Sequence, residues 1–572
     1  AIGSGSLGEN TTGTSNTSVG TGALNANTTA ANNTAVGYHA LVANTTGSEN
    51  TAVGQGALDA NTTAAGNTAV GSDALTANTT GANNTGIGKN ALEANTTGTT
   101  AVAVGYRSLN ANTTGDSNVA VGGDSLLLNT TGDKNVSVGA GALQSNTTAD
   151  NNTGVGYLAL GANTTGSENT AVGQGALDAN TTAAGNTAVG SDALTTNTTG
   201  ANNTGIGKNA LEANTTGAGG VAVGMNCLAA NTTGAENTAV GLSALLLNTE
   251  GAQNVAFGSS ALDACTTGDF NTAIGTSALG AVTTSDYNTA VGRNAGTAIT
   301  TGTQNTFVGG LAGDATDDGA NNVAVGFEAL SANCGSGNTA IGTRAGKITT
   351  ADNNTFVGNN AGTATTSGAG NTFIGAEAGD SITEGAGNTC AGLGAGAEIT
   401  TGDNNIAIGN DSHDGGTTGD NNISIGTSST PSAVGVANQI TLGNSSTASL
   451  RCQIQTIAAL SDQRDKTDII DLPYGLDFIN QTRPVQYKWD IRDKYINSKL
   501  GTNPHQGKVR NGFIAQELFA LGDAEQHQLA FNDNPDRLEA SYGNLIPMLT
   551  KAVQELSAQV EALTARIETL EG

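Results

Sequence analysis

The 572-residue chain is poor in charged residues, aromatic residues and proline. Only 12% of its residues are charged and 3% are aromatic, and it contains six prolines and a single tryptophan. Disordered chains combine low hydrophobicity with many charges and much proline, so this composition does not indicate disorder. No stretch approaches the roughly 20 consecutive apolar residues that a membrane-spanning helix needs. The sequence therefore predicts no membrane span.

Basic residues are also scarce, since 20 lysines and arginines stand against 48 aspartates and glutamates and the net charge is −28. A nucleic-acid-binding protein needs a basic surface that neutralises phosphates, so this balance argues against nucleic acid as a partner. The five cysteines are far apart, odd in number and without the spacing of metal ligands, and the four histidines form no cluster. We therefore expect no cofactor, no metal site and no disulfide framework.

Glycine, in contrast, is abundant and strictly periodic. The glycine that ends each Asn-Thr-Ala-Val-Gly-like segment occurs 27 times from Gly3 to Gly443, and 24 of the 26 intervals are 17 residues long while two are 16. One such repeat is too small to bury a core, so it must stack on its neighbours as one coil of a solenoid. The sequence therefore predicts an all-β repeat solenoid over residues 1–443.

The residue types within a coil predict its shape. An apolar residue precedes each of these glycines, and with the threonine two positions earlier, as in Thr34 and Val36, it predicts a strand with one buried face. A leucine four residues after the glycine, such as Leu24, forms a second apolar column. This column changes to glycine in most coils from Gly296 onward, which predicts a narrower cross-section there. We expect the periodic glycine at a corner with positive φ and the asparagine of each Asn-Thr-Thr in a left-handed turn.

A rod with one valine and one leucine per coil buries little apolar surface, so we expect chains to share the valine column in an oligomer, most simply a homotrimer. The recurring Asn-Thr-Ala-Val-Gly and Asn-Thr-Ala-Ile-Gly segments resemble the head repeats of trimeric autotransporter adhesins. That resemblance implies a left-handed parallel β-roll in which three chains pack through their inner strands. The usual period of that family is a few residues shorter, so the 17-residue coil is a departure.

The composition changes near residues 445–460. Residues 1–460 contain 8 lysines and arginines and one proline, whereas residues 461–572 contain 12 and five, together with the only tryptophan, Trp489. This shift predicts a separate domain of ordinary mixed composition. The predicted divisions are a repeat rod at 1–443, a neck or linker at 444–460, a small α+β domain at 461–545 and a coiled coil at 546–572.

Periodicity predicts the coiled coil. Its eight core positions alternate spacings of three and four over four heptads: Ile546, Leu549, Val553, Leu556, Val560, Leu563, Ile567 and Leu570. Isoleucine or valine at one core position and leucine at the other usually favours two parallel strands, which conflicts with a trimer. We nevertheless expect three strands, because the domain before the coil would fix the stoichiometry.

Several motifs of the second part carry a further resemblance. They are Ser-Asp-Gln-Arg-Asp-Lys-Thr-Asp-Ile-Ile from Ser461, Leu-Asp-Phe-Ile at 476–479, Arg-Pro-Val-Gln-Tyr-Lys-Trp at 483–489, Gly-Phe-Ile-Ala-Gln-Glu-Leu at 512–518 and Tyr-Gly-Asn-Leu-Ile-Pro-Met-Leu at 542–549. In this order they resemble the endosialidase-type intramolecular chaperone at the C-terminus of phage tail spikes and fibres. The resemblance implies trimerisation, assistance to the folding of the preceding fibre, and self-cleavage just before Ser461. Asp465 departs from the family, which usually has an apolar residue there.

Residue chemistry is compatible with such a cleavage. Ser461 would attack the Leu460 carbonyl once a base takes its proton. Lys466 is the nearest candidate base if burial lowers its pKa, with Asp462 as its orienting partner and Arg464 as oxyanion stabiliser. The alternative is that Ser461 and Asp462 cap a turn while the two basic side chains are solvated. The expected enzymatic activity is at most one self-cleavage by a serine peptidase mechanism, and the repeat region is not an enzyme.

These observations predict a structural virion fibre for host-surface attachment. The expected partners are a surface receptor (a glycan or a protein) and, through a region before residue 1, a tail or baseplate protein. Residues 43–98 and 162–217 are identical except for Ala77 against Thr196, which indicates the freely variable length of a spacer.

Two other functions stay open on the sequence alone. One is a cell-surface trimeric adhesin, and the other is an ice- or crystal-binding rod in which repeated Thr-Thr pairs form a flat array. The 14 Asn-Thr-Thr segments are also formal glycosylation sequons. In a bacterial product they would be turn residues, and in a eukaryotic virus they would be open to sugar.

Overall fold

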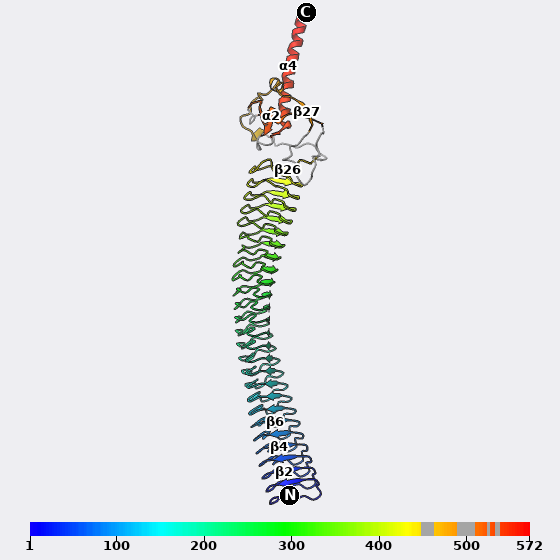
Figure 1. Cartoon of the computed structure of the whole chain (residues 1–572), viewed down its shortest axis with the longest axis vertical. Coiled ribbons are helices and arrows are strands. Elements are labelled where there is room, and N and C mark those ends of the chain that lie inside the picture. The colour runs from blue at the N-terminus through cyan, green and yellow to red at the C-terminus, as the bar shows by residue number, and fades with distance from the viewer. Residues whose placement is uncertain (448–462, 489–508, 523–526, 532–537) are drawn as a thin grey trace. The chain divides into compact units, whose positions relative to one another are not determined.

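The computed structural model describes residues 1–447, 463–488, 509–522, 527–531 and 538–572 (Figure 1). The chain divides into two compact units, residues 1–354 and 355–572. The first unit consists of repeat coils, and the second contains the last coils and the C-terminal elements. The coils make a parallel β-solenoid of about 25 turns with 17-residue spacing, which confirms the predicted fold class.

Each coil contributes one three-residue strand to a parallel sheet. Pairing places equivalent residues side by side at steps of 17, for example Thr34 opposite Thr51 and Val36 opposite Val53. It runs in register from β1 to β20 in the first unit and from β21 to β26 in the second. The strands of the first unit are β1 Thr17–Val19, β2 Thr34–Val36, β3 Thr51–Val53, β4 Thr68–Val70, β5 Thr85–Ile87, β6 Val102–Val104, β7 Val119–Val121, β8 Val136–Val138, β9 Thr153–Val155, β10 Thr170–Val172, β11 Thr187–Val189, β12 Thr204–Ile206, β13 Val221–Val223, β14 Thr238–Val240, β15 Val255–Phe257, β16 Thr272–Ile274, β17 Thr289–Val291, β18 Thr306–Val308, β19 Val323–Val325 and β20 Thr339–Ile341. Those of the second unit are β21 Thr355–Val357, β22 Thr372–Ile374, β23 Thr389–Ala391, β24 Ile406–Ile408, β25 Ile423–Ile425 and β26 Ile440–Leu442.

The strands turn their middle residue toward the interior of the coil, not the residue before the glycine. In β10, Ala171 is fully buried, whereas Val172 is 37% exposed and Thr170 is half-buried. The valine column therefore does not belong to the interior of the single chain, and the sharing of this column between chains stays a prediction. Because successive strand residues point to opposite faces, burying the small middle residue turns both β-branched neighbours outward.

The corner glycine has the positive φ predicted for it, and it also lies close to the backbone of the next coil. At Gly37 φ is 141°, and a Cβ atom would collide with the carbonyl oxygen of Gly54 in the next coil. Any other residue would push adjacent coils apart at the corner and strain its own backbone.

The leucine column is fully buried, as predicted, but its backbone is unusual. Leu24 has φ 50° and Leu41 has φ 53°, a left-handed conformation that residues other than glycine rarely adopt. His39, two residues before Leu41, and Asn32 are left-handed as well. Asn27 of the Asn-Thr-Thr turn is not, so the prediction of a left-handed asparagine there is wrong.

Asn27 instead belongs to a ladder of buried asparagines. In this ladder the Nδ2 atom of Asn44 donates to Oδ1 of Asn27 at 3.2 Å and that of Asn61 to Oδ1 of Asn44 at 2.9 Å, and each also donates to the carbonyl three residues later. A second ladder contains Asn33 and Asn50, where the backbone N–H of Asn50 donates to Oδ1 of Asn33 at 2.9 Å. Both ladders satisfy polar groups inside the coil and fix the register between coils.

The change from leucine to glycine in the later coils is matched by larger residues in the strands. A Cβ atom at Gly379 would collide with the ring of Phe373, which occupies the middle of β22 and is fully buried. Leu330 keeps its leucine, and its neighbours in the flanking strands are the small Ala324 and Ala340. The space that the leucine leaves is therefore refilled from the sheet, so narrowing is not needed to explain the change.

The C-terminal residues form a small α+β arrangement. Its elements are the 3₁₀ helix η1 (Gln463–Asp465), α1 (Leu476–Ile479), β27 (Val485–Lys488), β28 (Val509–Gly512), α2 (Ala515–Phe519), β29 (Ala530–Phe531), β30 (Glu539–Ala540), the 3₁₀ helix η3 (Tyr542–Asn544) and α4 (Leu545–Glu571). β27 pairs with β28 and β29 pairs with β30, both antiparallel. A small apolar core joins Phe478 of α1, Leu518 of α2, and Leu545 and Met548 of α4.

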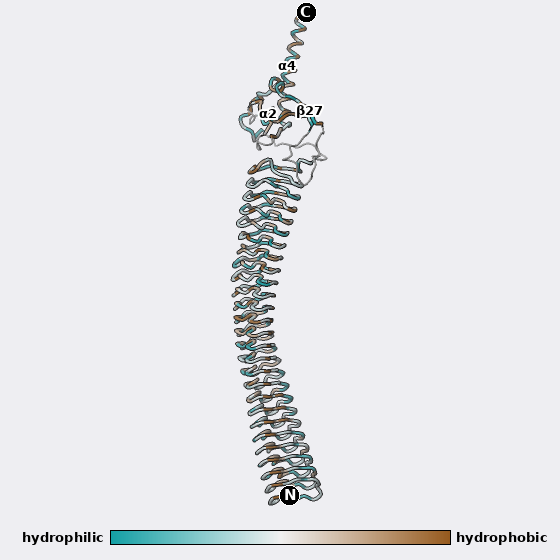
Figure 2. The backbone as a smooth tube through the Cα atoms, in the orientation of Figure 1, coloured by the Kyte–Doolittle hydropathy of each residue, from teal (hydrophilic) through white to brown (hydrophobic). Residues whose placement is uncertain are grey.

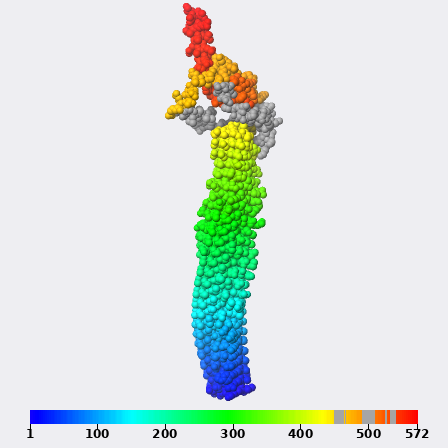
Figure 3. All heavy atoms as spheres, turned by 90° about the vertical axis from the view of Figure 1, so that its left-hand side faces the viewer, coloured from blue at the N-terminus to red at the C-terminus, as the bar shows by residue number. Residues whose placement is uncertain are grey.

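Apolar and polar residues alternate around every coil instead of gathering in one long segment (Figure 2). In the space-filling view the coils of the first unit form a continuous surface on the face shown (Figure 3). Among the described residues no helix is both long and apolar enough to span a bilayer.

Candidate functional site

Only part of the predicted cleavage centre lies within the described residues. Leu460, Ser461 and Asp462 lie outside them, and their roles stay predictions. Arg464 lies in η1, and Lys466 is the first residue after this helix. Both residues are exposed in the single chain. Activation of Lys466 as a base requires burial. Lys466 is not buried among the described residues, and its role as a base stays a prediction.

Motifs that are far apart in the C-terminal sequence meet in one small domain. Arg483, just before β27, donates from Nε to Oε2 of Glu517 in α2 at 2.9 Å, and a second hydrogen bond joins the same two groups. The hydrogen bonds from this guanidinium lower the pKa of the Glu517 carboxyl. Because both side chains are exposed, the pair orients the two motifs more than it stabilises them.

Two further contacts tie the end of the chain to these motifs. The Tyr542 hydroxyl accepts a hydrogen bond from the backbone N–H of Phe513 at 3.2 Å and donates to its carbonyl at 3.3 Å. The Glu555 carboxylate of α4 accepts from the backbone N–H of Leu476 at 2.7 Å, which satisfies a free donor at the start of α1. These contacts hold α4 against both α1 and the segment after β28.

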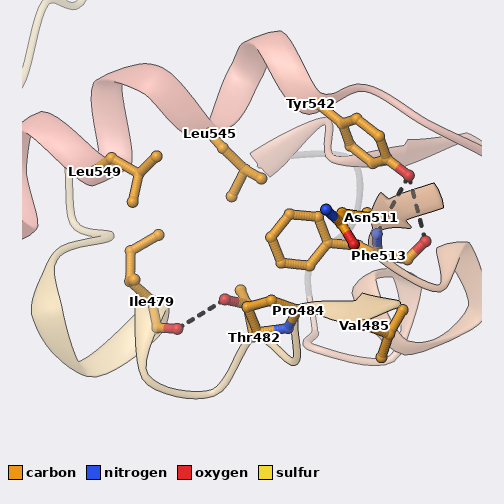
Figure 4. Close-up of a pocket in the computed structure, with 10 residues that line it drawn as sticks. Ile479, Thr482, Pro484, Val485, Asn511, Phe513, Tyr542, Leu545 and Leu549 are labelled. Atoms are coloured by element: carbon orange, nitrogen blue, oxygen red, sulfur yellow. Dashed lines mark hydrogen bonds between the residues drawn. The ribbon is translucent and has the colours of Figure 1, made fainter. Parts of the chain in front are cut away.

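A mainly apolar hollow of about 520 Å³ opens beside the start of α4 (Figure 4). Leu545 and Leu549 of α4 line it together with Ile479, Phe513 and Tyr542. Its lining contains no acid, base or nucleophile beyond threonine, asparagine and tyrosine side chains. Among the described residues the lining of the hollow is therefore mainly apolar.

The predicted heptad stripe of α4 is exposed along its whole length. Its eight residues range from 46% exposed at Leu549 to 80% at Leu570. The buried residues of the helix, Leu545, Met548 and Ala552, occupy different positions. A 27-residue helix with a second, unpartnered apolar stripe is the pattern expected of a coiled-coil seam.

The outward sheet face of the solenoid is a second unpartnered apolar surface. In the column before the corner glycine, Val172 is 37% and Ile206 is 40% exposed. The first strand position adds threonine, valine or isoleucine, so most of the face is β-branched, and Phe257, Ala391 and Leu442 are the exceptions in the second column. Flat faces of this kind pack well against other sheets.

The Asn-Thr-Thr segments face the interior more than the solvent. The hydroxyl of Thr45 donates to the carbonyl of Thr62 in the next coil at 3.1 Å, whereas Thr46 is exposed. Each pair therefore presents one outward threonine. The Nδ2 atom that a glycan would occupy is buried and hydrogen-bonded from Asn27 to Asn231, so the folded coils leave no room for sugar at these sequons.

Comparison with known families gives one result. Residues 461–526 match the model of the family described as chaperone of endosialidase. The match begins at Ser461 and includes Arg483 and Glu517, and it ends before Tyr542 and α4. No curated protein is significantly similar to the chain.

These findings define a class of protein. A long parallel β-solenoid followed by a chaperone-of-endosialidase region fits a tail fibre with a C-terminal chaperone domain.

Sequence reasoning missed the asparagine ladders and the contact between Glu555 and Leu476. The ladders had a visible signal, because asparagine recurs every 17 residues at two positions per repeat. The contact had none, since its partners are 79 residues apart.

Proposed function

We propose that this protein is a homotrimeric virion fibre, a tail fibre or tail spike that attaches a virus to a host surface. The observation that carries the proposal is the succession of a repetitive β-solenoid and, from Ser461, a region that matches the chaperone family. Nearly identical coils offer many wrong registers between chains. A C-terminal chaperone that gathers three chains before they zip together would select the right one.

Two surfaces support the trimer. The outward sheet face and the α4 stripe both expose regular rows of apolar side chains in the single chain. Three copies packed around one axis would remove both rows from water at once. A cell-surface adhesin would use the same trimer, and it would differ in the envelope component to which its N-terminal side is attached.

Self-cleavage is the first testable consequence. Freshly expressed protein is expected to yield residues 1–460 and a fragment that starts at Ser461, whereas Ser461→Ala yields only the intact chain. The Ser461 Oγ attacks the Leu460 carbonyl carbon, the C–N bond to Ser461 breaks as its nitrogen takes a proton, and water hydrolyses the resulting ester. Intact-mass spectrometry of both proteins measures the outcome.

Ser461→Thr, which keeps a hydroxyl, and Thr467→Ala, an exposed neighbour, serve as controls and should still be cleaved. Cleavage of Ser461→Ala at the same bond would assign the cut to another protease. A single intact species from the native chain would mean that processing is absent, with Asp465 as the first residue to restore to an apolar type.

The second consequence concerns the sheet face. Val172→Lys combined with Ile206→Lys is expected to abolish the trimer, because both side chains lie on the outward face and a buried lysine row would be strongly unfavourable. Thr182→Lys combined with Thr199→Lys adds the same charge at exposed turn positions and should leave the native mass at three chains. Native mass spectrometry distinguishes the two. A trimer that survives the sheet-face variant would place the interface elsewhere.

A further inference from the structure

His413 occupies the leucine-column position, at which the earlier coils carry leucine. It lies four residues after the corner Gly409, is fully buried, and has φ 61°, like the leucines of the earlier coils. Its backbone N–H donates to the carbonyl of Ser429 at 2.6 Å, as that of Leu24 does to Ala40. The residues that face it in the flanking strands are the small Ala407 and Ser424, which is the setting in which this column carries leucine elsewhere.

The imidazole is only partly satisfied inside the coil. Nδ1 lies 3.2 Å from the Ser424 hydroxyl, whereas Nε2 has no hydrogen-bond partner among the described residues. The buried hydroxyls of Ser412 and Ser429 also lack partners within that part of the chain. Each buried polar group without a partner costs free energy of folding, so these three groups lower the stability of the coils that contain them.

The surroundings of His413 supply no compensating charge. In its own coil Asp411 is half-buried, Asp414 is exposed, and Asp420 accepts the backbone N–H of Asp403 on the outer side. In the preceding coil Glu398 is exposed, and Asp403 accepts the N–H of Ala386.

The nearest buried titratable group farther back is Cys390, whose pKa burial raises to about 12, so it stays a neutral thiol. Residues 427–443, the following coil, contain no ionisable side chain. In the described coils next to His413 the carboxylates therefore lie at half-buried or exposed positions, whereas the imidazole is fully buried.

We propose that the last coils of the solenoid, from β24 to β26, are an acid-sensitive end that opens when His413 is protonated while the earlier coils stay folded. Burial lowers the pKa of His413 from 6.5 to about 4, because an imidazolium cannot be solvated there. The unfolded coil binds a proton below pH 6.5 and the folded coil resists it. The stability of these coils is therefore fully present above pH 6.5 and is lost as the pH falls toward 4.

Asp380, a carboxylate in an earlier coil of this unit, does not explain such a loss. Burial raises the pKa of Asp380, so acidification favours the folded state there, which is the opposite sign. The acid-sensitive coils directly precede the predicted linker at 444–460 in the sequence. Opening them would change the segment through which the rod continues into the chaperone region.

Hydrogen exchange of the full chain, followed by mass spectrometry, tests the inference. For peptides within 406–442, the opening equilibrium constant is expected to be about 30-fold larger at about pH 5 than at about pH 7.5, after correction for intrinsic exchange rates. In His413→Leu, and in His413→Gln if the first variant folds poorly, the same ratio should fall below about 3-fold because no proton is taken up.

His39→Gln is the matched control, since His39 is the other solenoid histidine and is only partly buried. That variant should keep the pH response of residues 406–442. A response that persists in both His413 variants would assign it to carboxylates and overturn the inference. So would a wild-type ratio near one, or an acid response of equal size in the coils of the first unit.

Discussion

Gly379→Leu is expected to lower the unfolding free energy of its coil by about 3 kcal/mol and Phe373→Ala by about 3–5 kcal/mol, whereas the double variant should recover at least half of the loss caused by Gly379→Leu. The leucine alone would enter the volume of the Phe373 ring, and the alanine alone would leave a cavity. Together they recreate the pairing of Ala52 and Leu58, six residues apart, that the earlier coils use. Native-state hydrogen exchange of peptides from β22 and β23 measures the three effects.

Gly370→Leu provides the control for backbone strain. Gly370 has φ 68°, close to the 58° of Gly379, but a Cβ atom there would meet no other atom within 4 Å. It should therefore cost only the strain of a left-handed leucine, about 1–2 kcal/mol. If the stability losses of Gly379→Leu and Phe373→Ala simply add in the double variant, the Phe373 ring does not fill the space that a leucine at position 379 would occupy. The explanation of the leucine-to-glycine change would then fail.

Asn163→Leu is expected to cost about 4 kcal/mol, because three hydrogen bonds lose a partner inside the coil. The Nδ2 of Asn163 donates to Oδ1 of Asn146 at 3.0 Å and to the Gly166 carbonyl at 2.9 Å, and its Oδ1 accepts from Asn180 at 2.9 Å. A leucine would leave Oδ1 of Asn146 and the Gly166 carbonyl without this donor, while Nδ2 of Asn180 would keep only its bond to the Ala183 carbonyl. Exchange protection of the coils on either side should fall together.

The end of the same ladder offers a matched comparison. Asn248 donates to Asn231 and to Gly251, but its Oδ1 has no donor within the described residues, because the next equivalent residue is Cys265. Asn248→Leu should therefore cost about 1 kcal/mol less than Asn163→Leu. Equal losses at both positions would show that the amide-to-amide bonds along the ladder contribute nothing of their own.

Much of the fold follows from the repeat. The 17-residue spacing of the corner glycine predicts coils, and the collision that a Cβ at Gly37 would make explains why no other residue appears there. The leucine column and the heptad stripe of α4 were equally visible in the sequence, because both depend on a period alone. The order of the C-terminal motifs pointed to the chaperone region that the family match confirms.

The alternating pattern of the strands did not by itself decide which side chains fill the interior of the coil, for a physical reason. Alternation fixes that Ala171 and Val172 point to opposite faces, but it does not say which face is inside. Hydrophobicity favours burial of the valine, whereas the narrow coil admits only a small residue beside the leucine column. Steric fit in the single chain therefore buries the alanine, and the valine lies on the outward face of the sheet.

The candidate site likewise has a part that the sequence predicts and a part that it does not. Ser461 and its neighbours could be named because the motif is local, yet whether Lys466 acts as a base depends on its burial, which a local motif does not determine. The contacts of Arg483 with Glu517 and of Glu555 with Leu476 join segments that share no local pattern. Only folding brings such groups together, so no reading of one segment could have found them.

By itself, the sequence determined the period, the number of coils and the division between a repetitive rod and a mixed C-terminal part, because each is a statement about order along the chain. The tertiary structure alone decided which face of the strand is buried, what the asparagines bond to, and that the His413 ring is fully buried beside Ser424. These depend on volume and on hydrogen-bond partners one coil away. Stacking brings residues that are 17 positions apart in the sequence into contact. The shape of the neighbouring residue in the next coil then outweighs the residue's own secondary-structure propensity.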